Sequence, residues 1–414
     1  MELIPLFAHK HIVLGVTGSI ASYKAVDLAS KLTQAGAWVD VIMTDAAQRF
    51  VTPLTFQAVT GRPVYTNLWQ TESQGGIATH IAHVGVAESA DLLAVIPATA
   101  DTIAKLAHGF AHDFLSITAL AARCPLIIAP AMDGEMYSHP LVQKNLEILR
   151  QHQAVIIEPE IGRFASGLVG QGRLPETQTL IGALRYTLSR QGALNGKKII
   201  VTAGGTREAL DPVRFITNRS SGKQGHALAQ AALDAGAHVT LISSAKHLAT
   251  PYGANLITVD STGQMHDAVL EAIPEADALV MSAAVADFRP REVATQKIKK
   301  KADAQGLTLE LEKTEDILIA VKNVREKTGF PRKVIGFAAE SNDLLQNAQD
   351  KRVRKGVDLL VANDISESDA GFDVETNRVV LLTPEGNEPL ELMSKAQVSE
   401  NIIQRLIQML QDER

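Results

Sequence analysis

The sequence has little cysteine, no excess of positive charge and no long apolar run. Cys124 is the one cysteine in 414 residues, which excludes an internal disulfide and fits a reducing compartment. The formal net charge of -6 gives no overall basic field to attract nucleic acid or an anionic membrane. No apolar run approaches the roughly 20 residues of a membrane span, and the opening MELIPLFAHKHIVLGV lacks the order of a signal peptide. We expect a soluble cytoplasmic protein with neither nucleic-acid nor membrane partners.

Two familiar nucleotide-binding motifs are also missing. No GxGxxG follows the first predicted strand, which weakens an assignment to NAD-dependent enzymes. The sequence NRSSGKQG at 218–225 resembles a Walker loop only superficially, because Gln224 stands where Ser or Thr is required. Hydrophobic residues still make up 46% of the chain, enough for a sizeable core, and the length predicts two to four domains.

Strands and helices alternate through the first half. Short apolar runs predict buried strands at 12–16, 38–43, 92–96, 126–129 and 155–157. A helix is predicted over 19–34, with Ala25, Leu28 and Leu32 on one face and Gly36 just beyond its end. Strands separated by helices predict a parallel sheet that is covered on both faces.

The same plan starts again near residue 190. The polar, glycine-containing segment 189–196 is typical of a linker, and AGAWVDVI at 35–42 is echoed by AGAHVTLI at 235–242. Further strands are predicted at 199–202, 279–282, 334–337, 359–362 and 379–382, and further helices at 222–234 and 394–411. We therefore predict two three-layer, doubly wound α/β domains, residues 1–190 and 191–414.

Three predicted strand ends in the first half carry small and hydroxyl residues. TGS at 17–19 joins a strand to a helix, where backbone N–H groups suit a phosphate. MTD at 43–45 and PATA at 97–100 end later strands. Ligands bind at the carboxyl ends of the strands in an open α/β sheet, so these ends predict one phosphorylated cofactor. An ordinary strand-to-helix turn has the same local pattern.

Other residues of the first half leave alternatives open. His80 and His83 could be packed or surface residues as well as functional ones, and the spacing around them is not that of a metal site. Asp133, in PAMD at 130–133, could be a helix N-cap. The glycine-rich segment 162–176 is either a connector or a lid over a site, and its Arg173 could bind a phosphate.

The second half combines basic loops with one suitable carboxylate. AGGT at 203–206 repeats the phosphate-loop pattern of the first half. KIKKK at 297–301 is the densest positive cluster and follows SAAVAD at 282–287, whose Asp287 suits Mg²⁺. A second basic stretch lies at 351–355. Solvated charge is the usual explanation of such runs, but together these features suit a nucleoside triphosphate with its metal.

Taken together, in this order and at these spacings, the motifs resemble the bacterial bifunctional coenzyme A biosynthesis proteins of the Dfp type over residues 11–400. The resemblance implies a flavodoxin-like FMN domain with phosphopantothenoylcysteine decarboxylase activity, followed by a Rossmann-like phosphopantothenate–cysteine ligase domain. The ligase would join 4′-phosphopantothenate to cysteine through an acyl-cytidylate made from CTP with Mg²⁺. The decarboxylase would then yield 4′-phosphopantetheine. Family precedent also implies ligase dimers and decarboxylase trimers, and hence a dodecamer.

For the first domain, the resemblance implies a flavin site and a catalytic histidine. His83 matches the histidine because it stands eight residues before Asp91. Asp133 and Ser166 occupy catalytic positions where the family usually has Asn and Cys, and Arg173 lies in the clamp that recognises substrate. The FMN-binding positions are Gly18, Ser19, Thr44, Pro97, Ala98, Thr99 and Ala100.

For the second domain, the resemblance implies two catalytic residues and a nucleotide site. Asn218 would stabilise the acyl-nucleotide, Lys297 would be the catalytic lysine and Asp287 would hold the metal. Glu315 replaces the usual Pro. The remaining substrate- or nucleotide-binding positions are Arg214, Met281, Ser282, Ala283, Glu315, Asp316, Ile317, Leu318, Phe337, Lys351 and Lys355.

Two departures from the family bear on the decarboxylase. In the family, FMN oxidises the sulfur of the substrate cysteine, CO₂ leaves and the clamp Cys supplies a proton. The hydroxyl of Ser166 is a far weaker acid, and the charge of Asp133 would oppose a substrate carboxylate unless it is protonated or paired. We expect an active decarboxylase with another proton donor. The alternatives are a flavin-binding regulatory protein with an active ligase half, and a dehydrogenase with two nucleotide domains.

Overall fold

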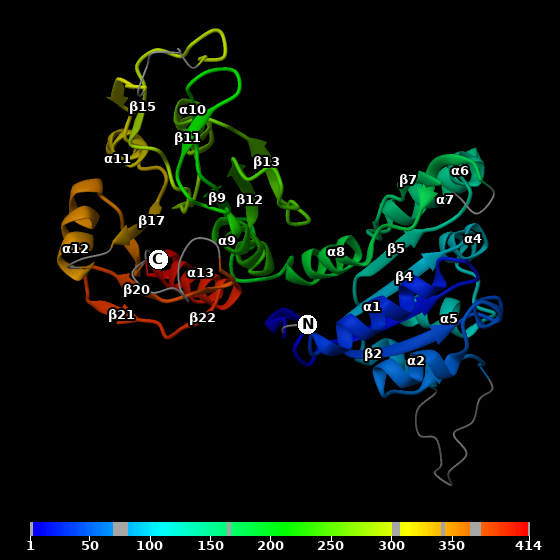
Figure 1. The fold of residues 1–414 in the computed structure, drawn as a ribbon. Helices are drawn as coiled ribbons and strands as arrows, with labels where there is room; N and C mark the ends of the chain where they lie inside the picture. Colours follow the sequence, from blue (N-terminus) through cyan, green and yellow to red (C-terminus); the bar gives the residue numbers. More distant parts are fainter. Residues whose placement is uncertain are drawn as a thin grey trace. The chain divides into compact units, whose positions relative to one another are not determined.

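The chain divides into two compact units, Met1–Ser189 and Arg190–Arg414, which we call the N-terminal and C-terminal units. The computed structural model describes residues 3–68, 82–163, 167–299, 307–340, 344–364 and 374–412. Each unit is built on its own sheet (Figure 1). Among the described helices, none is both long and apolar enough to cross a membrane.

A six-stranded parallel sheet forms the centre of the N-terminal unit. Across the sheet its strands are β3 (Val64–Tyr65), β2 (Trp38–Met43), β1 (His11–Val16), β4 (Leu92–Ala98), β5 (Leu126–Pro130) and β6 (Val155–Ile156). Without the two-residue edge strand β3, the other five follow the flavodoxin-like order 2-1-3-4-5. The order reverses between β1 and β4, so the loops that follow these strands lead to opposite faces and leave a crevice.

Helices pack on both faces of this sheet. They are α1 (Ser22–Gln34), α2 (Pro53–Thr60), α3 (Ala82–Ser89), α4 (Ala100–His108), α5 (Phe114–Ala121), α6 (Gly134–Ser138), α7 (Pro140–Gln151) and α8 (Thr177–Ser189), with single 3-10 turns η1 (Pro5–Phe7) and η2 (Ala47–Arg49). On one face α1 contacts α2 and α8; the other group comprises α3, α4, α5 and α7. There Val13 and Leu93 of the strands share a buried core with Ile103, Leu115 and Leu146 of the helices.

The helix predicted at 19–34 begins at Ser22 because a turn precedes it. The Ser19 N–H donates to the Thr17 carbonyl at 2.8 Å, and the Ser22 N–H donates to the Ser19 carbonyl at 3.0 Å. Beyond the helix, Gly36 has a φ of 101° and Gly236 of the second unit has 93°. Positive φ is costly for other residues, so the repeated AGA sequences at 35–37 and 235–237 mark two helix ends of the same geometry.

The glycine-rich segment after β6 forms an antiparallel hairpin rather than an unstructured loop. Its strands are β7 (Glu160–Arg163) and β8 (Val169–Arg173). The end of the hairpin is held by Lys24 of α1, whose side chain is buried. Its Nζ donates to the Leu174 carbonyl at 2.9 Å and to Glu176 Oε1 at 3.0 Å.

The C-terminal unit contains an eight-stranded sheet with a Rossmann-like parallel core. Across the sheet its strands are β13 (Asn255–Thr258), β12 (His238–Ser243), β9 (Lys198–Ala203), β14 (Ala278–Met281), β17 (Lys333–Glu340), β18 (Leu359–Asp364), β20 (Val379–Leu382) and β21 (Asn387–Pro389). The first six strands are parallel to one another, β20 is antiparallel to β18, and β21 is antiparallel to β20. The order reverses between β9 and β14, which again creates a crevice at the strand ends. The predicted doubly wound α/β fold is thus confirmed in both units.

In the described part of this unit, five helices cover the second sheet. They are α9 (Lys223–Asp234), α10 (Thr262–Ala272), α11 (Ile317–Thr328), α12 (Leu344–Lys355) and α13 (Lys395–Gln411). The helices α9 and α13 contact each other on one face, and α10, α11 and α12 form the other group. On that second face Met265, Val269 and Val321 pack against Leu279 of β14 in a buried core. The predicted helix start at Ser394 is a capping box with Gln397.

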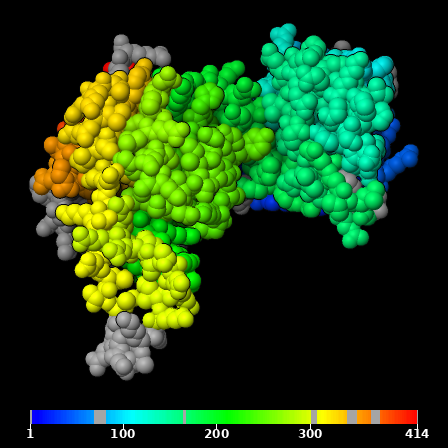
Figure 2. Space-filling model, turned by 90° about the horizontal axis from the view of Figure 1, so that it is seen from above, coloured from blue at the N-terminus to red at the C-terminus, as the bar shows by residue number. Residues whose placement is uncertain are grey.

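Within the described ranges, three short two-stranded ribbons accompany the C-terminal sheet. They pair β10 (Arg207–Ala209) with β11 (Phe215–Thr217), β15 (Phe288–Pro290) with β16 (Leu311–Lys313), and β19 (Thr376–Asn377) with β22 (Met393–Ser394). In the space-filling view, the yellow part of the chain, which includes β15, protrudes from the rest of this unit (Figure 2). The basic segment that follows β15 therefore starts from the surface.

Candidate active sites

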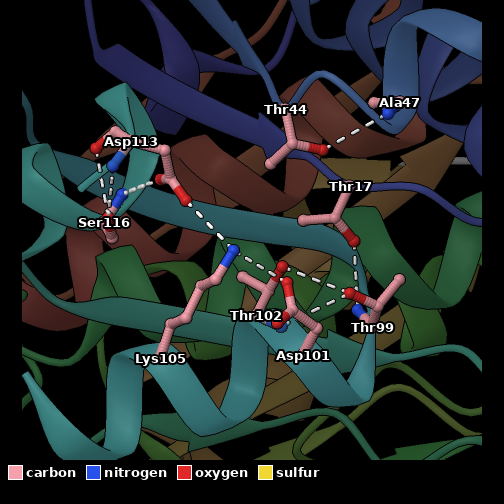
Figure 3. A network of polar contacts seen from close by, with 9 residues as sticks. All are labelled: Thr17, Thr44, Ala47, Thr99, Asp101, Thr102, Lys105, Asp113 and Ser116. Atoms are coloured by element: carbon pink, nitrogen blue, oxygen red, sulfur yellow. Dashed lines mark hydrogen bonds and ion pairs between the residues drawn. The ribbon is translucent and has the colours of Figure 1, made fainter. Parts of the chain in front are cut away.

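A single buried hydroxyl joins the carboxyl ends of β1 and β4. The Thr17 side chain has no exposed surface, and it donates to the Pro97 carbonyl at 2.7 Å. It also accepts from the Thr99 N–H at 3.0 Å (Figure 3). At the same turn, a Cβ on Gly18 would lie 2.5 Å from the Ala46 Cβ, so only glycine fits there. These contacts fix the positions at which α1 and α4 leave the sheet.

A cavity of about 580 Å³ lies at these strand ends, a volume typical of a cofactor site. It is lined by Gly18, Met43, Thr44, Asp45, Ala46, Thr66, Asn67, Leu68, Thr99, Asp101, Thr102, Lys105, His112, Asp113, Phe114 and Leu115. Gly18, Thr44 and Thr99 were predicted from the sequence as cofactor-binding residues. The predicted Pro97 and Ala98 are buried at the end of β4, while Ser19 and Ala100 are half-buried beside the cavity.

Among the described residues that line this cavity, the one lysine, Lys105, is already paired with acids. Lys105 Nζ lies 2.8 Å from Asp101 Oδ2 and 3.4 Å from Asp113 Oδ2 (Figure 3). Burial works to lower the pKa of Lys105, but the two carboxylates raise it above its usual value. Asp113 also accepts from the Ser116 N–H at 2.8 Å, as the N-cap of α5. A phosphate in this cavity would therefore be held by backbone N–H groups and hydroxyls rather than by a free cation.

An aromatic wall stands at another side of the cavity. The ring of Phe114, which lines the cavity, is stacked on Tyr65 with centroids 5.0 Å apart and an interplanar angle of 17°. His83 of α3 meets the same ring edge-on, at 6.4 Å and 89°. The structure thus brings the predicted His83 against a residue of the cavity wall. His80 lies outside the described residues. With the hydroxyl-lined strand ends, this wall suits a planar flavin that carries a phosphate.

The PAMD loop lies beside the hairpin. The Met132 N–H donates to the Gly172 carbonyl of β8 at 3.0 Å. Asp133 is the N-cap of α6 and accepts from the Glu135 N–H at 3.2 Å, which matches the N-cap interpretation made from the sequence. Arg173 forms an ion pair with Glu176 at 2.7 Å, so its guanidinium is held at the end of its own hairpin. Ser166 lies outside the described residues.

In the C-terminal unit, three polar side chains hold the loop that follows β14. The Ala283 N–H donates to Thr202 Oγ1 at 3.1 Å, and the Ala286 N–H donates to Thr206 Oγ1 at 2.9 Å. The predicted Asn218 donates from Nδ2 to the Val285 carbonyl at 3.1 Å. The segment that carries Asp287 is therefore fixed from β9 and from the loop after β11.

A cavity of about 770 Å³ lies beside this loop and gathers most of the residues predicted to bind nucleotide. It is lined by Asn218, Arg219, Met281, Ala283, Ala284, Val285, Asp287, Phe288, Lys313, Thr314, Glu315, Asp316, Ile317, Leu318, Phe337, Lys351 and Lys355. These residues come from segments far apart in the sequence. Ser282 lines a smaller cavity of about 120 Å³ that shares Ala283 and Phe337 with the larger one.

Two acidic residues of this larger cavity, Asp316 and Glu315, have defined partners. Asp316, the N-cap of α11, pairs with Lys355. Glu315 lies 3.2 Å from Nε2 of His266. Within the described part of the chain, no group of three His, Cys, Asp or Glu side chains could hold a metal ion. Asp287 still fits Mg²⁺, because this ion commonly takes one or two carboxylates together with substrate phosphates.

Two predicted residues, Arg214 and Lys297, are not among those lining the cavity. The guanidinium of Arg214 donates to Asp211 at 2.9 Å from Nε and at 2.6 Å from Nη2. It also donates to the Ile298 carbonyl at 2.7 Å, while the neighbouring Lys297 is exposed. Sequence reasoning missed Asp211. The available signal was an acid three residues before an arginine in a short turn.

Two families match the chain, one in each unit. Residues 7–189 match the Flavoprotein family, and residues 194–410 match the family of the DNA/pantothenate metabolism flavoprotein C-terminal domain. The protein is therefore a two-part flavoprotein of the pantothenate metabolism class.

Relatives that span the whole chain define the family further. The coenzyme A biosynthesis bifunctional protein of Bacillus subtilis (strain 168) is 45% identical over 402 residues, which cover 96% of this chain and 97% of that protein. The protein of the same name from Vibrio vulnificus (strain YJ016) is 43% identical over 399 residues, covering 96% and 98%. The crystal structure of the C-terminal domain of a coenzyme A biosynthesis bifunctional protein covers 54% of this chain and 100% of that chain at 35% identity, with a TM-score of 0.45. This chain belongs to the family of coenzyme A biosynthesis bifunctional proteins, as its motifs predicted.

Proposed function

We propose that this protein catalyses two successive steps of coenzyme A biosynthesis. The C-terminal unit ligates 4′-phosphopantothenate to cysteine with CTP, and the N-terminal unit decarboxylates the product to 4′-phosphopantetheine with FMN. The observation that carries the proposal is the 45% identity to a bifunctional relative over 96% of the chain. Each unit also has a cavity of ligand size at the strand ends where its sheet order reverses.

The residues of the C-terminal cavity suit the ligase chemistry. A carboxylate oxygen of 4′-phosphopantothenate attacks the α-phosphorus of CTP, and pyrophosphate leaves. The cysteine amine then attacks the acyl carbon, and CMP leaves. Lys351 and Lys355 would offset the phosphate charge, and Asp287 would bind Mg²⁺ together with the phosphates. Lys297 is the proposed catalytic lysine, reaching the phosphates from its exposed segment.

The residues of the N-terminal cavity suit a flavin and a substrate beside it. Gly18, Thr44 and Thr99 would hold the phosphate, and Phe114 would face the ring system. FMN, when bound, supplies the oxidising equivalent for the substrate thiol. The imidazole of His83, packed against Phe114, would take a proton from the substrate. Asp133 and the adjoining hairpin would cover the substrate, with Ser166 as the proposed hydrogen-bonding replacement for the family's cysteine.

Assembly and location complete the proposal. Family precedent supports ligase dimers and decarboxylase trimers, and therefore a dodecamer. The single cysteine fits a reducing compartment such as the cytoplasm.

The test is to incubate the purified protein with 4′-phosphopantothenate, cysteine and a nucleotide while pyrophosphate and CO₂ are followed separately. We expect pyrophosphate first, CO₂ second and FMN as the cofactor released on denaturation. A parallel reaction with ATP in place of CTP tests the nucleotide preference. Absence of pyrophosphate with either nucleotide would contradict the ligase assignment. Pyrophosphate without CO₂ would support the alternative in which the flavin unit is not an active decarboxylase.

A further inference from the structure

The turn between β10 and β11 contains a carboxylate with no exposed surface. The side chain of Asp211 is 0% exposed, although its neighbour Val213 is 61% exposed. Burial of a charge is costly unless donors compensate it. Such a residue at the tip of a surface ribbon therefore needs an explanation beyond the folding of the ribbon itself.

Five hydrogen bonds compensate Asp211. Four come from the turn itself. The backbone N–H groups of Val213 and Arg214 donate at 2.8 Å each, and the Arg214 guanidinium donates from Nε at 2.9 Å and from Nη2 at 2.6 Å. The fifth comes from another part of the chain, where the Ile298 N–H donates to Asp211 Oδ2 at 3.1 Å. With Arg214 as the main cause, these donors hold the pKa of Asp211 well below its usual range, so the carboxylate is ionised at neutral pH.

Arg214 also binds Ile298, through the carbonyl group of that residue. Its Nη2 donates to the Ile298 carbonyl at 2.7 Å, so both backbone polar groups of Ile298 are held by one acid–base pair. A third backbone contact, from the Ala294 N–H to the Leu210 carbonyl at 3.0 Å, anchors the same segment a few residues earlier. The segment leading to the lysine run is thus fixed on the β10–β11 turn.

The Ile298 N–H belongs to the peptide unit that joins Lys297 to Ile298. Because a peptide unit is planar, a bond to this N–H also fixes the Lys297 carbonyl and α-carbon. The Lys297 side chain remains exposed and can move toward a ligand. The pair of Asp211 and Arg214 therefore fixes the backbone that carries this cation without neutralising its charge, since among the described residues the Lys297 ammonium group makes no hydrogen bond or ion pair.

We propose that Asp211 is a positioning residue for Lys297: together with Arg214 it holds the peptide between Lys297 and Ile298, so that the lysine reaches the nucleotide during ligation. The proposal rests on the ligase function proposed above. It assigns Arg214 a structural partner in its own unit and adds a residue, Asp211, that no motif had identified.

The test compares Asp211→Asn with the unchanged protein in CTP-dependent pyrophosphate release. The amide keeps the size of the side chain but weakens the bonds to Arg214 and Ile298. We expect kcat to fall about 10- to 100-fold, with a change of less than about twofold in KM for CTP, because Lys351, Lys355 and Asp287 are untouched. Amide hydrogen exchange in the peptide 291–299 should become faster, which a general loss of stability would not confine to this segment.

Two further variants keep the result interpretable. Arg214→Lys retains the charge but lacks the planar fork that spans Asp211 and Ile298, so we expect an intermediate loss and intermediate exchange; it replaces Asp211→Asn if that variant fails to fold. Asp260→Asn removes an exposed carboxylate that pairs with Lys246 at 2.7 Å and should change neither readout.

Normal kcat and normal exchange in Asp211→Asn would overturn the inference. A fall in kcat without faster exchange at 291–299 would also overturn it, because Asp211 would then act in some other way. If the unchanged protein released no pyrophosphate, the proposed function would fail. The claim that Asp211 holds this segment would then be decided by the exchange measurement alone.

Discussion

The two units begin with the same strand–turn–helix plan, but the charged residues that line their cavities differ. In the N-terminal cavity, one lysine faces three aspartates, and that lysine is bonded to two of them. In the C-terminal cavity, three lysines and an arginine face three carboxylates. Backbone N–H groups and hydroxyls at the first cavity suit a single phosphate. Under the proposed function, the larger number of basic side chains at the second cavity would offset the charge of a triphosphate, although Lys355 is itself paired with Asp316.

The two units are alike at the point where the strand order of each sheet reverses, because a buried threonine there joins the ends of the two central strands. Thr17 bridges β1 to the end of β4, and Thr202 bridges β9 to the end of β14. Both threonines are fully buried. The shared scaffold thus places a cavity at the reversal point of each sheet, while the charges that line the two cavities differ.

The largest expected effect comes from a variant that should impair the ligase reaction and leave the decarboxylase reaction unchanged. Lys297→Gln removes the proposed catalytic cation and should lower CTP-dependent pyrophosphate release by at least about 10³-fold. Flavin content and CO₂ release from supplied 4′-phosphopantothenoylcysteine should not change. Lys299→Gln, two residues along the same exposed segment, is the matched control. Ordinary ligation by the Lys297 variant would remove the lysine from the mechanism.

A second variant should impair the decarboxylase reaction and leave the ligase reaction unchanged. His83→Asn should lower CO₂ release about 10²- to 10³-fold because the proposed proton acceptor is lost, while pyrophosphate release stays normal. His108→Asn, a surface histidine 3.1 Å from Asn145, is the control within the same unit, and His80→Asn should also be silent. Loss of CO₂ release in His80→Asn but not in His83→Asn would reverse the assignment.

The paired threonines predict a smaller, structural difference. Thr17→Val leaves both the Pro97 carbonyl and the Thr99 N–H without their partner, which should cost about 1–3 kcal/mol of stability and weaken flavin retention. Thr202→Val leaves only one backbone group, the Ala283 N–H, without its partner. It also removes a weak contact from Thr202 Oγ1 to the sulfur of Met281 at 3.3 Å. Its effect on the C-terminal unit should be smaller. Denaturation curves monitored by flavin release report on the N-terminal unit, and curves monitored by loss of ligase activity report on the C-terminal unit.

The smallest effect concerns the anchor of the hairpin. Lys24 lowers the pKa of Glu176, so this pair stabilises the fold above the ordinary glutamate pKa of about 4.3 and ceases to do so as the pH falls through the lowered pKa. Because Glu176 is largely exposed, Lys24→Met should cost about 0.2–1 kcal/mol through this pair.

The readout is the difference in unfolding free energy between variant and unchanged protein across that pH range, together with hydrogen exchange in the hairpin. Lys31→Met removes an exposed pair with Asp27 on the same helix and should leave hairpin exchange unchanged. Unaltered hairpin exchange in the Lys24 variant would show that the anchor lies elsewhere.

Much of the fold could be predicted from the sequence because the signals are local. The apolar run WVDVIM gave the bounds of β2 without error, and VVLL gave those of β20. The hairpin at 160–173 could not be predicted, since glycines are compatible with both a connector and a paired ribbon. The α1 start was set too early, because the turn at Ser19 depends on backbone bonds rather than on side-chain pattern.

The candidate sites were predictable where residues follow a strand end. Gly18, Thr44 and Asp287 follow such ends, and all three line the cavities. Phe337, which was predicted at a strand end, also lines a cavity but lies inside β17. Asp211 could not be recognised in this way. Its importance arises from a contact with Ile298, 87 residues further along the chain, and such a pairing leaves no local pattern in a single sequence.

The central claim is that one chain carries two independent sites that act in sequence. The most direct test mixes the His83→Asn and Lys297→Gln proteins with 4′-phosphopantothenate, cysteine and CTP. We predict that each variant alone forms 4′-phosphopantetheine at least about 10²-fold more slowly than the unchanged protein, and that the mixture restores its formation with release of both pyrophosphate and CO₂. Failure of the mixture, with each protein folded and flavin bound, would contradict the account.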